Sequence, residues 1–286
     1  MKSVFWMMGT LTSFCFMAIA VRELSADINT FQILFFRSLI GLVVISLIIA
    51  RTQTSLFRSK RLKQHLLRNT FHFGGQYGWF LGLGLLPLAQ VFALEFTTPL
   101  WTLLIAAWIL KEKITVKKAT SILLGLAGVY IIVSPGSEIF NIISMVVLAA
   151  ALCYAISHIS TKSLSSSEHP LTILFYMCAI QLPIAGFFTF NNWYLPDLWQ
   201  WCWLSIVGIT ALTAHYCITK AMHHSEVSTV VTLDFLRLPL IAILGIMLYS
   251  EDFNSSLMIG ASLMLLGNLL NTYKLKTLKQ QRHEEG

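Results

Sequence analysis

LEFTTPLWTLLIAAWILKE at residues 94–112 and LDFLRLPLIAILGIMLYSE at residues 233–251 are two copies of one pattern. Each copy has a carboxylate, Glu95 or Asp234, at its second position, then a long apolar run, and ends on a glutamate. The alignment continues without a gap through these pairs: Glu112 with Glu251, Leu124 with Leu263, and Gly128 with Gly267. The pattern predicts an internal duplication of the chain.

A second match lies earlier in each copy, where the stretch 33–36 resembles the stretch 173–176 at nearly the same spacing along the chain. Apolar runs of about twenty residues, the length that crosses a bilayer as one helix, recur throughout the chain. We expect ten spans, near residues 3–21, 29–50, 69–86, 87–110, 115–133, 141–161, 170–190, 200–219, 225–249 and 254–273. The first run could imitate a signal peptide, but further runs follow and no small-residue cleavage site closes it, so we interpret it as a span.

The composition excludes a water-soluble domain. Of the 286 residues 56% are hydrophobic and only 12% are charged, whereas a soluble protein has about 25% charged residues. The net charge of +7 would suit nucleic acid only if the basic residues gathered on one folded face, and here they lie between apolar runs. The cysteines show no paired spacing, so we expect no disulfide frame, no metal site and no cofactor.

Basic residues predict the orientation, because they are retained on the cytoplasmic side of a membrane. Nearly all of them fall on one side if both termini are cytoplasmic: Lys2, Arg51, Arg58, Lys60, Arg61, Lys63, Arg68, Lys111, Lys113, Lys117, Lys118, Lys162, Lys220, Lys274, Lys276, Lys279 and Arg282. Five spans per copy is an odd number, so the second copy enters the membrane upside down. Inverted repeats are a known architecture of secondary transporters, with the solute site near the midplane.

We therefore predict an all-α integral membrane protein of the inner (plasma) membrane, with ten transmembrane helices arranged as two inverted five-helix repeats. The repeats are expected at residues 1–136 and 137–274, followed by a basic cytoplasmic tail at 275–286. The chain lacks a Gly-rich phosphate loop for ATP-driven pumping and the clustered acids, zinc motif or activated serine of a membrane-embedded enzyme. A channel or receptor is disfavoured by the duplication. The expected function is non-enzymatic transport of a small solute, driven by an ion gradient or by exchange.

The chain resembles the drug/metabolite transporter superfamily, in its EamA-type branch, over nearly its whole length. The resemblance rests on the order and spacing of short motifs: Phe35-Phe36-Arg37, Leu86-Pro87-Leu88-Ala89, Pro99-Leu100, Lys111-Glu112-Lys113-Ile114-Thr115, Leu233-Asp234-Phe235-Leu236-Arg237-Leu238 and a final Glu251. It implies that spans 1 to 4 and 6 to 9 enclose a central cavity, with spans 5 and 10 at the periphery. A homodimer that forms through these peripheral spans is a further expectation. Within the family the chain looks closest to bacterial S-adenosylmethionine uptake carriers, with vitamin and amino-acid carriers as near alternatives.

Ionisable groups inside spans are costly, so each is a candidate for the solute site. Arg37 and Glu95 have similar depths in the second and fourth spans, which predicts that they pair, either as a static ion pair or as cavity charges. Asp234 and Arg237 are spaced i, i+3 and share one face of the ninth span, where they either neutralise each other or face the solute. Asp234, and after it Glu95, are candidates for proton coupling, because intramembrane carboxylates serve as proton relays.

Glu112 and Glu251 stand at span ends, just before new helices, and are interpreted as structural carboxylates that face a helix N-terminus. Three histidines lie toward the inner ends of spans: His72, His158 and His215. We interpret them either as hydrogen-bonded interfacial residues or as part of the cavity wall.

Gln76 shares a face with His72, and His215 is its repeat equivalent in the gap-free alignment of the two copies. Trp101 and Tyr154 are candidate stacking walls for a planar or cationic solute, although packing alone would also explain them. The predicted substrate-binding set is Arg37, Gln76, Glu95, Trp101, Tyr154, His215, Asp234 and Arg237. Charges of both signs favour an amphoteric metabolite such as an amino-acid derivative, and a vitamin such as riboflavin, a nucleoside or a drug would fit the same walls.

Overall fold

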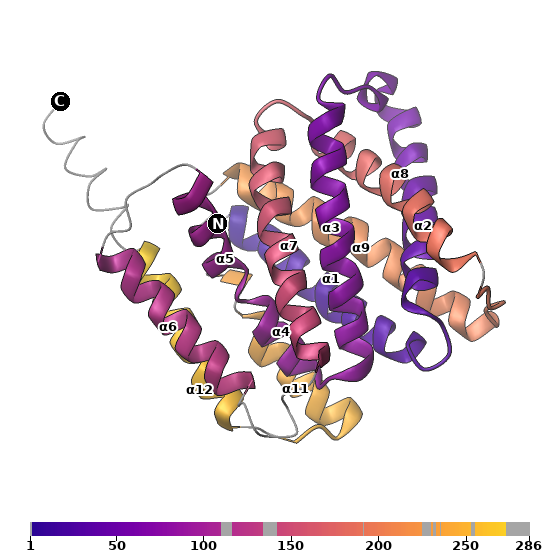
Figure 1. Cartoon of the computed structure of the whole chain (residues 1–286). Helices are drawn as coiled ribbons and strands as arrows, with labels where there is room; N and C mark the ends of the chain where they lie inside the picture. Colours follow the sequence, from indigo (N-terminus) through magenta and orange to yellow (C-terminus); the bar gives the residue numbers. More distant parts are fainter. Residues whose placement is uncertain are drawn as a thin grey trace, which may run out of the picture.

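The protein is all-helical throughout the part that the computed structural model describes, which comprises residues 2–109, 116–133, 142–190, 192–224, 230, 233–234, 236–252 and 255–272 (Figure 1). Its α-helices are α1 (Lys2–Leu24), α2 (Thr30–Thr52), α3 (Leu62–Leu85), α4 (Leu88–Glu95), α5 (Thr98–Ile109), α6 (Val116–Val133), α7 (Ile142–Ser165), α8 (Pro170–Thr189), α9 (Leu198–His224), α11 (Arg237–Tyr249) and α12 (Ser255–Thr272), with one 3-10 turn, η1 (Thr54–Phe57). The predicted all-α membrane fold is confirmed.

The helices α1, α2, α7, α8 and α9 are long and apolar enough to cross a membrane. Helix α3 has a comparable length, 24 residues, or roughly 36 Å at the usual helical rise, but it is more polar. Its polar side chains are buried, among them His65, Arg68, Asn69, His72 and Gln76. Polar groups of a membrane helix face the protein interior because lipid cannot solvate them, so α3 must line the inside of the bundle.

The helices pack in pairs that follow the duplication. Helix α1 packs most extensively on α9, and α3 packs most extensively on α7. In both pairs, the first span of one copy packs on the third span of the other copy. The pairs α2 with α8, α4 with α11, and α6 with α12 each join equivalent spans. Figure 1 shows α3 beside α7 in the body of the molecule, and α6 beside α12 at one edge. The two halves are therefore intertwined, and the fifth and tenth spans are peripheral as expected.

Glycine permits the closest helix crossings. A Cβ atom at Gly78 of α3 would lie 2.9 Å from the Cβ of Ala150 and 3.0 Å from the carbonyl oxygen of Val146 on α7. A Cβ atom at Gly128 of α6 would lie 2.5 Å from the carbonyl oxygen of Gly260 on α12. Within lipid, where the hydrophobic effect does not drive helices together, such close backbone approach supplies much of the packing energy.

Equivalent residues start equivalent helices. The side chain of Asn29 accepts a hydrogen bond from the backbone N–H of Phe31 at the start of α2. His169, at the equivalent place in the second copy, accepts one from the N–H of Leu171 at the start of α8. Both side chains cap N–H groups that have no partner inside their helix.

The fourth span, expected near residues 87–110, is interrupted by a turn. Helix α4 ends at Glu95 and α5 begins at Thr98, with a tight turn in which the N–H of Thr97 donates to the carbonyl of Leu94 across 3.1 Å. Pro99 favours a new start here, because a proline lacks the N–H that continues a helix but fits the first turn of one.

The ninth span has the same turn at the equivalent place. The N–H of Leu236 donates to the carbonyl of Leu233, also across 3.1 Å, directly before α11 begins at Arg237. These two residues are the repeat equivalents of Thr97 and Leu94. Each turn thus lies beside an intramembrane carboxylate, Glu95 or Asp234. The exact repeat boundary at residues 136 and 137 stays a prediction, while Glu112 and the tail at 275–286 lie outside the described residues.

Candidate functional site

The two interrupted spans bring three charged side chains together. Arg237, at the start of α11, donates through Nη2 to Oδ2 of Asp234 at 2.5 Å and to Oε1 of Glu95 at 3.2 Å. The prediction that Asp234 and Arg237 share a face is therefore confirmed. Glu95 comes from the first half of the chain and the other two residues from the second half.

An aromatic cage surrounds the guanidinium group of Arg237. Its Cζ atom lies 4.5 Å from the ring centroid of Phe14, 5.2 Å from that of Phe92 and 5.3 Å from that of Phe96. A desolvated cation is attracted to such ring faces. These ring contacts help to hold the guanidinium group of Arg237 in place.

Several polar atoms of this cluster are buried without a hydrogen-bond partner: Oε2 of Glu95, Oδ1 of Asp234, and Nε and Nη1 of Arg237. Buried polar atoms are normally satisfied, and exceptions mark places where a ligand, an ion or water binds. The cluster holds two carboxylates for one guanidinium group, so with all three ionised it carries a net negative charge.

A small cavity of about 40 Å³ adjoins the cluster. It is lined by residues from both halves of the chain: Phe14, Arg68, His72, Glu95, His158, Thr161, His215, Ile218, Thr219, Asp234 and Arg237. Small-molecule sites usually measure ~300–1,000 Å³, so this cavity is too small for a metabolite and has room only for water. A solute can occupy it only after the helices move apart.

The predicted pair between Arg37 and Glu95 is wrong. Arg37 instead donates through Nη1 to Oε1 of Gln181 at 3.2 Å, and its Nη2 contacts Sδ of Met177 at 3.9 Å, both on α8. Glu95 is paired with Arg237. The equal depth of two residues in neighbouring spans does not determine which way their side chains face.

Of the predicted substrate-binding residues, four line the cavity: Glu95, His215, Asp234 and Arg237. The other four, Arg37, Gln76, Trp101 and Tyr154, are not among its lining residues. Gln76 is buried. Trp101 donates from Nε1 to Oγ1 of Thr97 at 3.0 Å. The ring of Tyr154 meets the ring of His72 edge-on and stacks on the ring of His158. These residues support the wall or the interrupted span behind it.

Arg68 does not lie where the basic run predicts it. That run indicates a cytoplasmic loop, yet Arg68 is only 3% exposed and lines the cavity. His72 and His158 line the cavity as well, in agreement with one of the two interpretations proposed for them. No group of three or more histidine, cysteine, aspartate or glutamate side chains in the described residues is arranged to hold a metal ion.

Described residues of the two halves contact each other at both ends of the bundle. At one end, Glu251 accepts from the N–H of Leu88 at the start of α4 and from Nη2 of Arg22, which also donates to the carbonyls of Leu83 and Leu86. Glu251 thus faces a helix N-terminus as predicted, but that of α4 rather than that of the helix following it.

At the other end, Arg61 donates to the backbone and hydroxyl oxygens of Ser163 and to Ser167, while Ser59 donates to Glu168 at 2.6 Å. These contacts join the two halves of the chain at both ends of the bundle.

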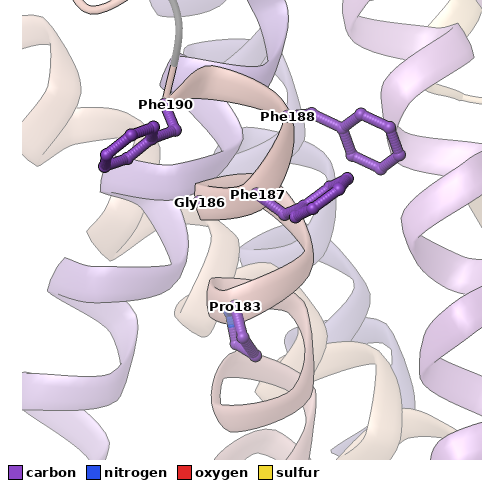
Figure 2. Close-up of a pocket in the computed structure, with 5 residues that line it drawn as sticks. All are labelled: Pro183, Gly186, Phe187, Phe188 and Phe190. Atoms are coloured by element: carbon purple, nitrogen blue, oxygen red, sulfur yellow. The ribbon is translucent and has the colours of Figure 1, made fainter.

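A larger hollow of about 550 Å³ lies on the outer surface of α8. Figure 2 shows its lining residues Pro183, Gly186, Phe187, Phe188 and Phe190. Phe187 and Phe190 are 79% and 82% exposed, and none of the lining side chains carries a polar group. Such a surface suits contact with lipid and lacks groups that would orient a polar solute.

Paired inverted spans, interrupted helices and buried charges around a small cavity define a membrane transporter. The chain belongs to the EamA-like transporter family, whose profile matches residues 1–134 and again residues 141–273. This membership confirms the expected family and the prediction of a transporter rather than an enzyme.

Curated relatives of the chain carry three kinds of name. An S-adenosylmethionine uptake transporter of Rickettsia bellii is 24% identical over 95% of this chain and 93% of its own length. A riboflavin transporter of Brucella anthropi is 29% identical over 82% of this chain and 87% of its own length. A pseudopaline exporter of Pseudomonas aeruginosa is 26% identical over 86% and 87%, respectively. The relatives thus agree on transport and differ in solute and direction.

A solved crystal structure of another protein superposes on this chain with a TM-score of 0.69. It covers 96% of this chain and 98% of its own, at 16% sequence identity. That likeness supports the fold.

Proposed function

We propose that this protein is a secondary active transporter that moves a small amphoteric metabolite across the inner membrane by alternating access. The solute class is an amino-acid derivative such as S-adenosylmethionine. The names of the Rickettsia relatives support this class, as do charges of both signs around one small cavity. Movement of the halves would open the cavity to one side at a time.

The observation that carries the proposal is the placement of Arg237 between two carboxylates. Asp234 and Arg237 are close neighbours in the chain and move together, whereas the contact from Arg237 to Glu95 joins the two halves of the chain. A movement that separates the fourth span from α11 therefore breaks the contact with Glu95 while the contact with Asp234 is kept. A solute or proton that binds the released carboxylate is then coupled to the movement.

Proton coupling is part of the proposal, with Asp234 as the first candidate and Glu95 as the second. Each carboxylate has one oxygen without a partner in this structure, and each lies beside the cavity. A carboxylate that exchanges an arginine partner for solute or water in each cycle meets two different electrostatic environments. Such a difference is what allows a proton to be taken up on one side and released on the other.

The orientation is proposed from the basic residues. Both termini are assigned to the cytoplasm, together with η1 and the adjoining loop at residues 53–61, which contains Arg58, Lys60 and Arg61. A homodimer through the peripheral helices α6 and α12 is also proposed, because these two helices lie at one edge of the bundle (Figure 1).

A riboflavin carrier is the second candidate function. The Brucella anthropi relative bears that name and has the higher identity, 29%. Riboflavin lacks a cation and a carboxylate that the charged residues of the cavity would match. Its selection would rely instead on the aromatic wall formed by the rings of Phe14, His72, His158 and His215. A nucleoside or drug carrier would depend on the same wall.

Solute counterflow in proteoliposomes tests the proposal. Vesicles with purified protein are loaded with unlabelled S-adenosylmethionine or riboflavin, and entry of the same labelled compound is followed. We expect internal S-adenosylmethionine to accelerate entry of its labelled form, and protein-free vesicles to show no acceleration. Acceleration by riboflavin alone would favour the second candidate, and acceleration by neither compound would contradict both.

A further inference from the structure

Two arginines are buried at the wall of the bundle, and neither has an acidic partner among the residues that the structure describes. Arg37 of α2 is 1% exposed and Arg68 of α3 is 3% exposed. Arg68 lines the central cavity. Full burial of a guanidinium group is uncommon and requires compensation.

The contacts of both arginines are with neutral groups. Arg68 donates from Nε to Oγ1 of Thr161 at 3.1 Å and from Nη1 to Oδ1 of Asn69 at 2.5 Å. Arg37 contacts Gln181 and Met177. No carboxylate of the described residues lies within ion-pair distance of either arginine. This differs from Arg237, which has two.

A network of amides connects these arginines to the cavity wall. Gln181, which accepts from Arg37, donates from Nε2 to the carbonyl of Asn69 and lies 2.9 Å from Nδ1 of His72. His72 Nε2 and Asn69 Nδ2 are buried without a partner. Arg37 and Arg68 therefore give this side of the bundle two positive charges. It also has further unpaired polar nitrogens, and among them Asn69 Nδ2 is a free hydrogen-bond donor.

Two clusters of opposite charge line the cavity. Around Arg68 the charge is positive, whereas Glu95 and Asp234 outnumber Arg237 and give the other cluster an excess of negative charge. A buried charge without a counter-ion is unfavourable, and an arriving ion of opposite sign offsets that cost. The arrangement is complementary to a solute that carries both a carboxylate and a cationic group.

We propose that Arg68 binds the carboxylate of the transported solute, and that the solute's ammonium or sulfonium group faces Glu95 and Asp234. Arginine suits this role because its planar guanidinium group forms charge-assisted hydrogen bonds with a carboxylate. Arg37 adds positive charge behind the wall through Gln181. This inference rests on the proposed function, and it adds a solute orientation and a residue that the predicted substrate-binding set lacks.

Competition between two probes that differ by one carboxylate tests the inference. Counterflow of labelled S-adenosylmethionine is measured against unlabelled S-adenosylmethionine and against its decarboxylated analogue. In the wild-type protein we expect the analogue to compete about tenfold to a hundredfold more weakly, the effect of one lost charged hydrogen-bonding partner. In Arg68→Gln the two compounds should compete equally, with the potency of the analogue unchanged.

Arg51→Gln is the matched control, because Arg51 is an exposed arginine in the last turn of α2. It should keep the wild-type preference, and Arg68→Lys should keep part of it. The wild-type preference is measured without any variant, so a misfolded Arg68→Gln protein does not end the test.

Equal competition by both compounds in the wild-type protein would overturn the inference while leaving the proposed function intact. A full preference for the carboxylate in Arg68→Gln would also overturn it, because another group would then bind the carboxylate. Absence of any S-adenosylmethionine counterflow in the wild-type protein would contradict the proposed function first, and the role of Arg68 with it.

Discussion

Arg237 donates a hydrogen bond to Glu95 across the two halves of the chain, with 3.2 Å between Nη2 and Oε1. Arg237 is buried and the side chain of Glu95 is 15% exposed. Arg237 is held at the same time by Asp234 and by three phenylalanine rings. The contact links the interrupted fourth span to the start of α11. The first prediction concerns this link.

Arg237→Met should destabilise the protein by about 3–5 kcal/mol, because it leaves two buried carboxylates without their cation. Glu95→Gln should cost less, since Arg237 keeps Asp234. The double variant Arg237→Met with Glu95→Gln should be less destabilised than the sum of the single changes, by ~0.5–3 kcal/mol. Thermal unfolding in detergent measures all three. Coupling between Arg37 and Glu95 instead, with none between Arg237 and Glu95, would contradict the observed pairing.

The second prediction concerns the crossing of α3 and α7. Gly78→Ala places a methyl group within 3.0 Å of α7, so we expect a loss of about 1–3 kcal/mol of stability from overpacking. Gly74→Ala is the control on the same helix, because its nearest neighbour, Sγ of Cys153, would lie 3.5 Å away. The control should be neutral or slightly stabilising, since alanine favours helix more than glycine. Equal melting temperatures for the two variants would refute the close crossing.

The third prediction concerns orientation. Lys60 is an exposed residue in the basic loop after η1, and Asn192 is an exposed residue after α8. In a cysteine-free background, a membrane-impermeant thiol reagent applied to intact cells should modify Asn192→Cys and spare Lys60→Cys. Permeabilised cells should show modification of both. The reverse pattern in intact cells would mean that the protein sits the other way round in the membrane.

The fourth prediction concerns the end of the bundle at Glu251. Its carboxylate holds Leu88 N–H and Arg22, so Glu251→Gln should favour opening on this side. Loss of ~1 kcal/mol of contact energy raises the open population about fivefold. A thiol is introduced in the cavity as Thr219→Cys and labelled from outside. The rate of this labelling should rise by the same factor. Asp252→Asn, a change to the exposed neighbouring acid, should leave the rate unchanged, and equal rates for both variants would show that Glu251 does not hold the bundle closed.

Much of the architecture follows from the sequence because apolar length and duplication are strong signals. The run at residues 29–50 anticipates α2 at Thr30–Thr52, and the gap-free alignment of the two copies anticipates equivalent turns beside Glu95 and Asp234. The interruption itself is hidden in the apolar pattern, although Pro99 marks it. An apolar run shows that a segment lies in lipid or in the protein core, but it does not show where the hydrogen-bond ladder stops.

The site is harder to predict because depth along a helix does not determine the direction of a side chain. Arg37 and Glu95 have similar depths, yet Arg37 faces Gln181 on α8 and Glu95 faces Arg237. Arg68 follows a run of basic residues, which favours a cytoplasmic position. Helix α3 in fact begins at Leu62 rather than near residue 69, so Arg68 lies in its second turn and points inward. Its neighbours Asn69 and His72 are the available signal, since a polar stripe on a membrane helix indicates an interior face.

The central claim is that the carboxylates beside Arg237 connect solute movement to the proton gradient, and Asp234→Asn tests it most directly. Net uptake of S-adenosylmethionine under a proton gradient and its exchange without a gradient are measured on the same proteoliposomes. We predict that net uptake falls to the level of protein-free vesicles, because the amide cannot carry a proton. Exchange should be retained with a weaker apparent affinity, because Glu95 still faces the cationic group of the solute. Loss of both would assign Asp234 to solute binding alone. Unchanged net uptake with unchanged proton dependence would contradict the claim.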